Sequence, residues 1–429
     1  MDQTLPAETA VWPLWRKVLF RFLFIYLILE TAPWTWLDFL NFINKFYYQF
    51  IDWLTAVANS SLFHVRKVLV PVNGSGDTSA GWAGLWLYIL LGVIGCVIWS
   101  VADRKRLNYT WLNYWLCLFC RYFIAFVALQ YGIIKLFDYQ MPFPNLHQLA
   151  TPLGDFLPMR LSWMFIGYSG PYQTFSGIME IIAALLLLFR RTATLGVLFA
   201  TAVFVNVMML NLCYDIPVKI FSMQLVFTCL FLAANESKRI ICFFILNKPA
   251  DVCSIYHFNY TKKWMRITRI VLKVVFIFLF LVAPLANNVV NIVFGPATHP
   301  PVLREGIYDV TQYRVNHQDI PALLTDTLRW QDFIITKDNG SIKTRDTSFI
   351  QRYNRAYFLY KVDTLKHTLT FTKKDTVVIL TMNYLLPDTN TIKLSGKRGN
   401  DSLFVELKRT KRHFQLAEKQ FHWLSEKNR

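Results

Sequence analysis

The chain has 429 residues, of which 54% are hydrophobic, 16% aromatic and only 17% charged. This composition is too apolar and too poor in charge for a soluble enzyme, and it indicates an integral membrane protein. The formal net charge of +18 does not indicate nucleic-acid binding. Part of the basic excess lies in loops beside the expected membrane helices, and the rest alternates with Asp along expected strands. The expected partner is therefore the lipid bilayer, with no nucleic acid.

Apolar runs of the length that crosses a bilayer recur along the chain and predict about seven membrane-spanning helices. The first run resembles a signal peptide, but Arg21 interrupts it and no small-residue cleavage site follows. We therefore expect a retained helix. The expected spans lie near Val18–Glu30, Trp82–Val101, Trp111–Leu136, Thr174–Phe189, Ala193–Cys213, Val218–Ala234 and Ile270–Val290.

A long connection separates the first two expected spans. Within it, Asp38–Ala58 carries Trp, Phe and Tyr at helical spacing, which predicts an interfacial or re-entrant helix. The Gly-rich residues 73–78 lack the Lys of a P-loop, so they predict a flexible turn rather than a phosphate cradle.

Lys and Arg are concentrated in every second connection between spans, as in Arg104–Arg106 and Arg190–Arg191. This positive-inside pattern predicts a cytoplasmic amino terminus, and an odd number of spans places everything after Val290 outside. We therefore expect an integral membrane protein whose carboxy-terminal domain lies on the outer side of the membrane.

Residues 303–429 differ from the rest because short runs of β-forming residues alternate with turn signals. They predict an all-β domain, an antiparallel sheet closed into a small barrel or sandwich. Its His residues lack ligand spacing, so no metal site is expected. The expected strands are Tyr308–Val315, Trp330–Ile335, Ala356–Val362, Thr368–Thr372, Val377–Tyr384, Thr391–Leu394 and Leu403–Leu407.

Several polar residues lie inside the apolar runs between Arg121 and Asn235. Hydrocarbon tolerates such groups only when they pair or face a cavity. The helical rise places Glu180 about 20 Å from the cytoplasmic side, with Arg121 near enough to reach it. This arrangement predicts a ligand pocket open outward with Glu180 at its floor. The alternative is an Arg121–Glu180 pair that only holds two helices in register. The candidate ligand-binding residues are Arg121, Gln130, Tyr131, Lys135, Glu180, Asn206, Asn211, Tyr214, Asp215, Lys219 and Gln224.

Cys117 and Cys120 form a CxxC motif within the third expected span. A redox CxxC normally lies at an accessible helix amino terminus, where the thiolate is stabilised. Here the surroundings are apolar, so we expect both residues to be small buried core residues.

The polar positions also carry a resemblance to a known family. Arg121 through Lys135 resembles the first core helix of the DoxX family, and Gly177–Glu180 followed by Arg190-Arg191-Thr192 resembles its second. Asn206, Asn211 and the turn from Tyr214 to Lys219 are similar to its third helix and outward turn. The resemblance implies a four-helix membrane core, and the whole layout is similar to long DoxX-like proteins of Bacteroidota.

On this basis the chain divides into four regions. Residues 1–110 contain two spans and the interfacial segment, and 111–235 the DoxX-like core. Residues 236–302 contain a basic cytoplasmic loop and the last span, and 303–429 the β domain. The expected fold is thus a mainly α membrane protein with a small extracytoplasmic all-β domain.

The resemblance implies a subunit of a membrane redox or envelope-stress system that binds quinone or another lipid-like ligand, with a membrane or periplasmic redox partner. The sequence assigns no catalytic residues and contains no evident cofactor motif, so quinone is the cofactor that this interpretation allows. The alternative is a non-enzymatic scaffold or cargo-binding protein that acts through its β domain. A transporter ranks below both, because no broken helix pair is repeated in two halves.

Overall fold

The computed structural model describes residues 11–36, 41–72, 76–249, 262–295, 302–323, 326–337, 339–373, 377–418 and 423–424. It divides into two compact units. The helical unit comprises Met1–Pro142 and Pro158–Gly295, and the barrel unit comprises Phe143–Leu157 and Pro296–Arg429. Residues 143–157, which the sequence analysis placed with the membrane core, therefore belong to the barrel unit.

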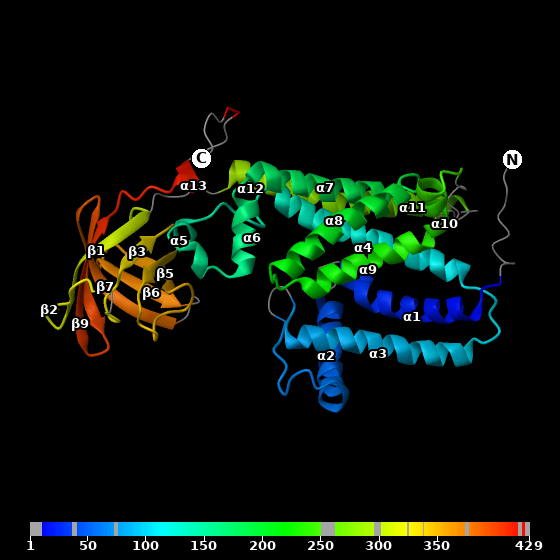
Figure 1. Ribbon diagram of the computed structural model, residues 1–429, viewed down its shortest axis with the longest axis horizontal. Coiled ribbons are helices and arrows are strands. Elements are labelled where there is room, and N and C mark those ends of the chain that lie inside the picture. Colours follow the sequence, from blue (N-terminus) through cyan, green and yellow to red (C-terminus); the bar gives the residue numbers. More distant parts are fainter. Residues whose placement is uncertain are drawn as a thin grey trace. The chain divides into compact units, whose positions relative to one another are not determined.

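The helical unit consists mainly of long helices (Figure 1). Its α-helices are α1 (Leu14–Thr31), α2 (Asn41–Ala58), α3 (Ser79–Ala102), α4 (Thr110–Leu136), α6 (Pro158–Gly167), α7 (Gly170–Leu188), α8 (Ala193–Cys213), α9 (Lys219–Asn235), α10 (Ser237–Ile240), α11 (Lys263–Ile277) and α12 (Ala283–Phe294). Single turns of other helix types are η1 (Pro33–Thr35), η3 (Asn59–Phe63), η5 (Ile241–Ile245) and η6 (Phe278–Val282).

Among the described residues, six helices of this unit are long and apolar enough to cross a membrane. They coincide with six of the expected spans, and the last runs without interruption from Lys263 to Phe294. Helix α9 coincides with the remaining expected span, but it has only 17 residues and is followed by a 74° bend into Ser237–Ile245. The count reaches seven if this bent pair forms one span. Helix α2 confirms the helix expected in the first long connection.

Helix α4 is the centre of the unit, because 61% of its most apolar window is buried, against 6% for Lys263–Phe294. It packs against α7 and α9, and α8 packs against both of these, so the four helices form a closed bundle. Two glycines permit the closest approach: a Cβ at Gly177 would lie 2.6 Å from the carbonyl oxygen of Gly132. The backbones of α4 and α7 therefore touch directly at this level.

Helix α1 tolerates Arg21 within its apolar run because hydrogen bonds satisfy the guanidinium. The buried guanidinium donates hydrogen bonds of 2.9 Å to the hydroxyls of Tyr109 and Ser100 and to the carbonyl oxygen of Asp103. Because these partners lie at the end of α3 and the start of α4, Arg21 joins three helices.

The barrel unit is an eight-stranded antiparallel up-and-down barrel, closed by pairing between its first and last long strands, β1 and β9. The two-residue strand β2 extends β1 outside the closed ring. The strands are β1 (Gly306–Val315), β2 (Gln318–Asp319), β3 (Asp332–Ile335), β4 (Asn339–Lys343), β5 (Arg355–Asp363), β6 (Thr368–Lys373), β7 (Val377–Asp388), β8 (Thr391–Arg398) and β9 (Asp401–Arg409). Short helices are α5 (Leu146–Leu149), η4 (Leu153–Asp155) and α13 (Gln415–Glu418).

Aromatic side chains fill the barrel interior, since alternate residues of each strand point inward. The rings of Trp330 and Phe333 stack at 5.9 Å, and those of Phe358 and Phe371 meet edge to face at 4.7 Å. All seven expected strands are present, and the barrel alternative is confirmed over the sandwich. Strands β2 and β4 are not among the expected strands.

Candidate functional site

A buried ion pair between Lys135 of α4 and Glu180 of α7 forms the candidate site of the helical unit. Only 8% of the Lys135 side chain and 1% of the Glu180 side chain are exposed. The hydroxyl-bearing ring of Tyr131, one turn before Lys135, lies near Glu180 and packs 6.4 Å from the ring of Phe221 in α9. The site thus combines a cation, an anion and a phenol within the bundle.

The glycine contact between α4 and α7 positions this pair. A Cβ at Gly177 would lie 3.0 Å from the Cβ of Lys135, so a larger residue there would force the two helices apart. Glu180 follows Gly177 by three residues and therefore lies on the same face of α7. Close backbone approach thus brings the carboxylate within reach of the ammonium group.

The expected pairing of Glu180 with Arg121 is wrong. Arg121 precedes Lys135 by about 21 Å along α4. Its buried guanidinium lies 5.6 Å from the ring of Tyr122, toward the opposite end of the helix. Because Gly132 lies opposite Gly177, the face of α7 that holds Glu180 meets the end of α4 that holds Lys135.

The remaining expected residues separate into groups. Asn211 is buried and donates to the carbonyl oxygen of Val218 over 3.4 Å, while Lys219 pairs with the exposed Asp215 at 2.7 Å. These contacts shape the turn between α8 and α9. Gln224 lies instead beside Tyr26 of α1. The other three expected residues are exposed and belong to neither group: Gln130, Asn206 and Tyr214.

Sequence reasoning missed Asp77, which caps α9 from a distant part of the chain. Its two carboxylate oxygens accept hydrogen bonds from the backbone amides of Lys219 at 2.7 Å and Ile220 at 3.0 Å. These amides belong to the first turn of α9, where helical partners are missing and negative charge is favoured.

Sequence reasoning also missed a second acid within an apolar helix, the half-buried Glu30 at the end of α1. Both of its oxygens are shielded from solvent, and among the described residues neither accepts a hydrogen bond of ordinary geometry. The hydroxyls of Tyr26 and Thr228 are candidate donors close by. The available signal is an acid within an apolar run, but Glu30 enters the prediction only as the last residue of the first expected span.

Both thiols of the CxxC motif are fully buried, as expected for core residues. Cys117 contacts the side-chain oxygen of Asn113 at 3.9 Å, and Cys120 lies near Cys117 and Cys229. Within the described part of the chain, no group of three or more His, Cys, Asp or Glu is arranged to hold a metal ion.

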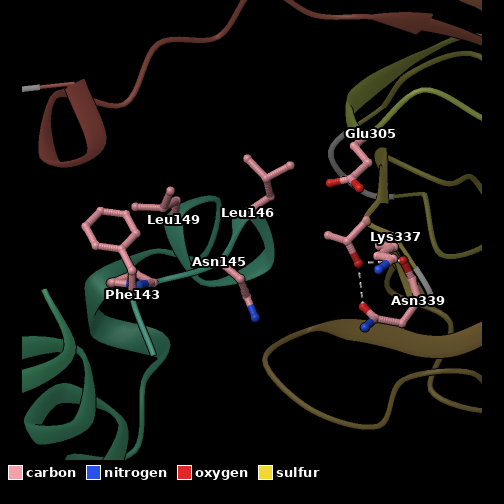
Figure 2. Close-up of a pocket in the computed structure, with 9 residues that line it drawn as sticks. Phe143, Asn145, Leu146, Leu149, Glu305, Lys337 and Asn339 are labelled. Atoms are coloured by element: carbon pink, nitrogen blue, oxygen red, sulfur yellow. Dashed lines mark hydrogen bonds between the residues drawn. The ribbon is translucent and has the colours of Figure 1, made fainter. Parts of the chain in front are cut away.

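The barrel unit has a pocket of about 460 Å³ between the segment around α5 and the β3–β4 connection (Figure 2). This volume falls in the range of small-ligand sites. One wall is apolar and includes Phe143, Leu146 and Leu149, whereas Glu305 and Lys337 lie on the other side (Figure 2). The pocket therefore combines an apolar surface with both signs of charge.

His147 joins α5 to the barrel through hydrogen bonds, one of them to the pocket residue Asn339. Its two ring nitrogens lie 2.8 Å from Ser341 Oγ and 2.9 Å from Asn339 Oδ1. Ser341 also accepts a hydrogen bond of 2.7 Å from Arg355, whose buried guanidinium pairs with Asp332. The pKa of His147 is lowered to about 4, mainly by burial; the hydrogen bond to Asn339 opposes this shift, and the charge of Arg355 adds to it. His147 is therefore a neutral structural residue at ordinary pH.

The fold and these sites define a class: a helical protein with six helices long and apolar enough to cross a membrane, and a closed eight-stranded barrel. The chain is 34% identical over 133 residues to the uncharacterized protein YwoB of Bacillus subtilis (strain 168), an alignment that covers 30% of this chain and 82% of YwoB. The chain belongs to the same family as YwoB. No protein-family model matches it, and no solved structure matches it significantly.

Proposed function

We propose that this chain is a DoxX-type integral membrane protein whose helical unit binds the polar head of a lipid-like molecule, such as a quinone, at the Lys135–Glu180 pair. In this proposal it serves a redox or envelope-stress system of the bacterial inner membrane. The amino terminus is cytoplasmic and the barrel unit periplasmic, with a membrane or periplasmic protein as the redox partner.

The observation that carries the proposal is the burial of Lys135 and Glu180 against each other in an apolar helix bundle. Charges in hydrocarbon are costly, and they more often serve a ligand or proton path than stability. Lys135 supplies a hydrogen-bond donor and Glu180 an acceptor, while Tyr131 can do either. This set suits the carbonyl and hydroxyl oxygens of a quinone and its reduced form.

Lipid extraction and mass spectrometry of the purified protein test this proposal. We expect wild type to retain quinone at near-stoichiometric amount and Glu180→Gln to lose it. Tyr172→Phe is the control, because it removes a polar group from an exposed position of α7, the helix that holds Glu180.

The double variant Lys135→Met with Glu180→Met separates ligand binding from structural support. Replacing a buried ion pair by apolar residues of similar volume is often neutral or stabilising. A stable double variant without bound quinone supports the proposal. Wild type that carries only ordinary phospholipid contradicts it.

A second candidate function is a scaffold or cargo-binding role of the barrel unit, and the pocket beside α5 favours it. Reversing the charge of Lys337 would then abolish partner capture in the full-length protein. Lys361→Glu, on an exposed position of β5, is the matched control. Equal partner capture by wild type and Lys337→Glu would eliminate this role for the pocket.

A further inference from the structure

The pocket beside α5 carries two charged side chains of opposite sign on the wall across from α5 (Figure 2). Glu305 directly precedes β1, and Lys337 lies in the connection between β3 and β4. Both residues are exposed, and among the described residues neither side chain forms an ion pair or a hydrogen bond. The pocket therefore offers a carboxylate and an ammonium group that the described part of the fold leaves without partners.

A chain of hydrogen bonds orients the side-chain amide of Asn339, which also lines the pocket. Arg355 can only donate, so Ser341 Oγ accepts from it at 2.7 Å and donates its own hydrogen to Nδ1 of His147 at 2.8 Å. Nε2 of the neutral His147 therefore carries the ring hydrogen and donates it to Oδ1 of Asn339 at 2.9 Å. This leaves the amide nitrogen of Asn339 as a hydrogen-bond donor for the pocket.

The wall on the α5 side is apolar. Leu146 and Leu149 are three residues apart on α5, so they lie on the same face of this helical turn. Leu146 also packs against Ile307 and Ile334 of the barrel, which holds the wall in place. An apolar surface thus faces the two charges across a cavity of about 460 Å³.

We propose that this pocket binds a free amino acid with an apolar side chain. The carboxylate of the ligand accepts hydrogen bonds from Lys337 and from the amide nitrogen of Asn339, and its ammonium group donates to Glu305. Its side chain lies against Leu146 and Leu149, where it is removed from water. Each chemical group of the ligand thus meets its complement in the pocket.

The presence of both charges favours a zwitterion over a ligand with a single charge. Glu305 would repel an anion that lacks an ammonium group, and Lys337 would repel a cation that lacks a carboxylate. A peptide carboxyl terminus fits less well for the same reason, since its last nitrogen belongs to a neutral amide. The inference shares its pocket with the second candidate function, but it needs no protein partner.

Isothermal titration calorimetry of the full-length protein in nanodiscs tests the proposal, with leucine as the probe. We expect leucine to bind, and glycine, N-acetylleucine and leucinamide to bind more weakly, because each lacks one of the three complementary groups. Lys337→Gln and Glu305→Gln should each raise the Kd of leucine about fivefold. Lys361→Gln and Asp309→Asn are the matched controls, because they remove the same charges from exposed positions of barrel strands.

The weaker probes show whether each variant acts through its own charge. Lys337→Gln should not weaken the binding of leucinamide, and Glu305→Gln should not weaken that of N-acetylleucine. N-acetylleucine that binds wild type as tightly as leucine, and equally well to Glu305→Gln, would overturn the zwitterion and leave a peptide carboxyl terminus as the occupant.

Leucine that releases no heat and does not slow hydrogen exchange of residues 143–149 would overturn the site itself. Partner capture that depends on Lys337 would still support the second candidate function, so the two hypotheses can fail separately.

Discussion

Among the described residues, each unit contains an ion pair with both side chains largely buried, but the two pairs lie in opposite surroundings. Lys135 and Glu180 lie between helices whose outward faces are apolar and exposed. Arg355 and Asp332 lie on the outer side of a barrel whose interior is aromatic, beneath α5. In the helical unit, polar groups therefore gather inside, whereas in the barrel unit they cover a filled apolar core.

This difference changes what each ion pair can contribute. The barrel has a hydrophobic driving force of its own, so its ion pair mainly fixes how α5 and the strands meet. Helices in lipid lack that driving force, and small residues and polar contacts determine which faces meet. Helices α4 and α7 meet through contacts of this kind, namely the small residues Gly132 and Gly177 and the polar pair Lys135–Glu180 at the same level.

We expect the largest effect from Asp332→Asn in the barrel. This change leaves the Arg355 guanidinium, 1% exposed, without its counter-charge, and breaking a buried pair costs about 3–5 kcal/mol. Hydrogen exchange of the barrel strands in the full-length protein measures the loss. Asp319→Asn breaks the exposed pair with Arg314 and should change exchange little. Equal effects of the two variants would contradict the distinction.

The next effect is a loss of α5 docking in mild acid. The pKa of His147 is about 4 when docked and 6.5 in its ordinary state, so the undocked segment binds a proton first. The free energy of docking therefore falls as pH drops from 6.5 to 4, by about 3 kcal/mol in all. Hydrogen exchange of residues 143–157, corrected for intrinsic rates, measures it.

The variant His147→Gln tests whether this histidine is responsible. Gln cannot titrate, so docking in the variant should be weaker at neutral pH but nearly constant between pH 6.5 and 4. A variant that keeps the wild-type pH profile would assign the acid effect to other groups. This variant therefore tests the burial of His147 between α5 and the barrel strands, and it does not test burial in the membrane.

A smaller loss is expected from Glu180→Gln in the helical unit. Lys135 is the penultimate residue of α4, so its long side chain can turn toward the membrane interface when its partner is removed. We expect a loss of about 1–3 kcal/mol, less than in the barrel. Thermal unfolding in nanodiscs measures it, and adding Lys135→Met should recover most of the loss. A loss equal to that of Asp332→Asn would remove the contrast between the units.

Local patterns predicted most of the elements in both units. Apolar length located the long helices, and alternation located every strand with four or more β-forming residues. Strand β4 was missed because Asn339 and Gly340 at its start indicate a turn. Strand β2 has only two residues and no pattern of its own.

Contacts between distant residues were harder to predict. The polar positions of α4 and α7 were found, but helical rise alone could not show that Lys135, not Arg121, faces Glu180. That choice depends on the Gly132–Gly177 contact, which sets the level of one helix against the other. Docking of residues 143–157 on the barrel likewise depends on side chains almost two hundred positions away in sequence, as in the contact of His147 with Ser341.

The smallest effect should come from Asp77→Ala, which removes a polar contact from an end of the helical bundle. The change frees the first amides of α9 and should cost about 1 kcal/mol, as for the loss of other helix caps. Faster hydrogen exchange at Lys219 and Ile220 measures it. Asp215→Ala removes the same charge from the exposed partner of Lys219 and leaves those amides capped. If both variants speed exchange equally, the charge of the turn, and not the cap, holds the start of α9.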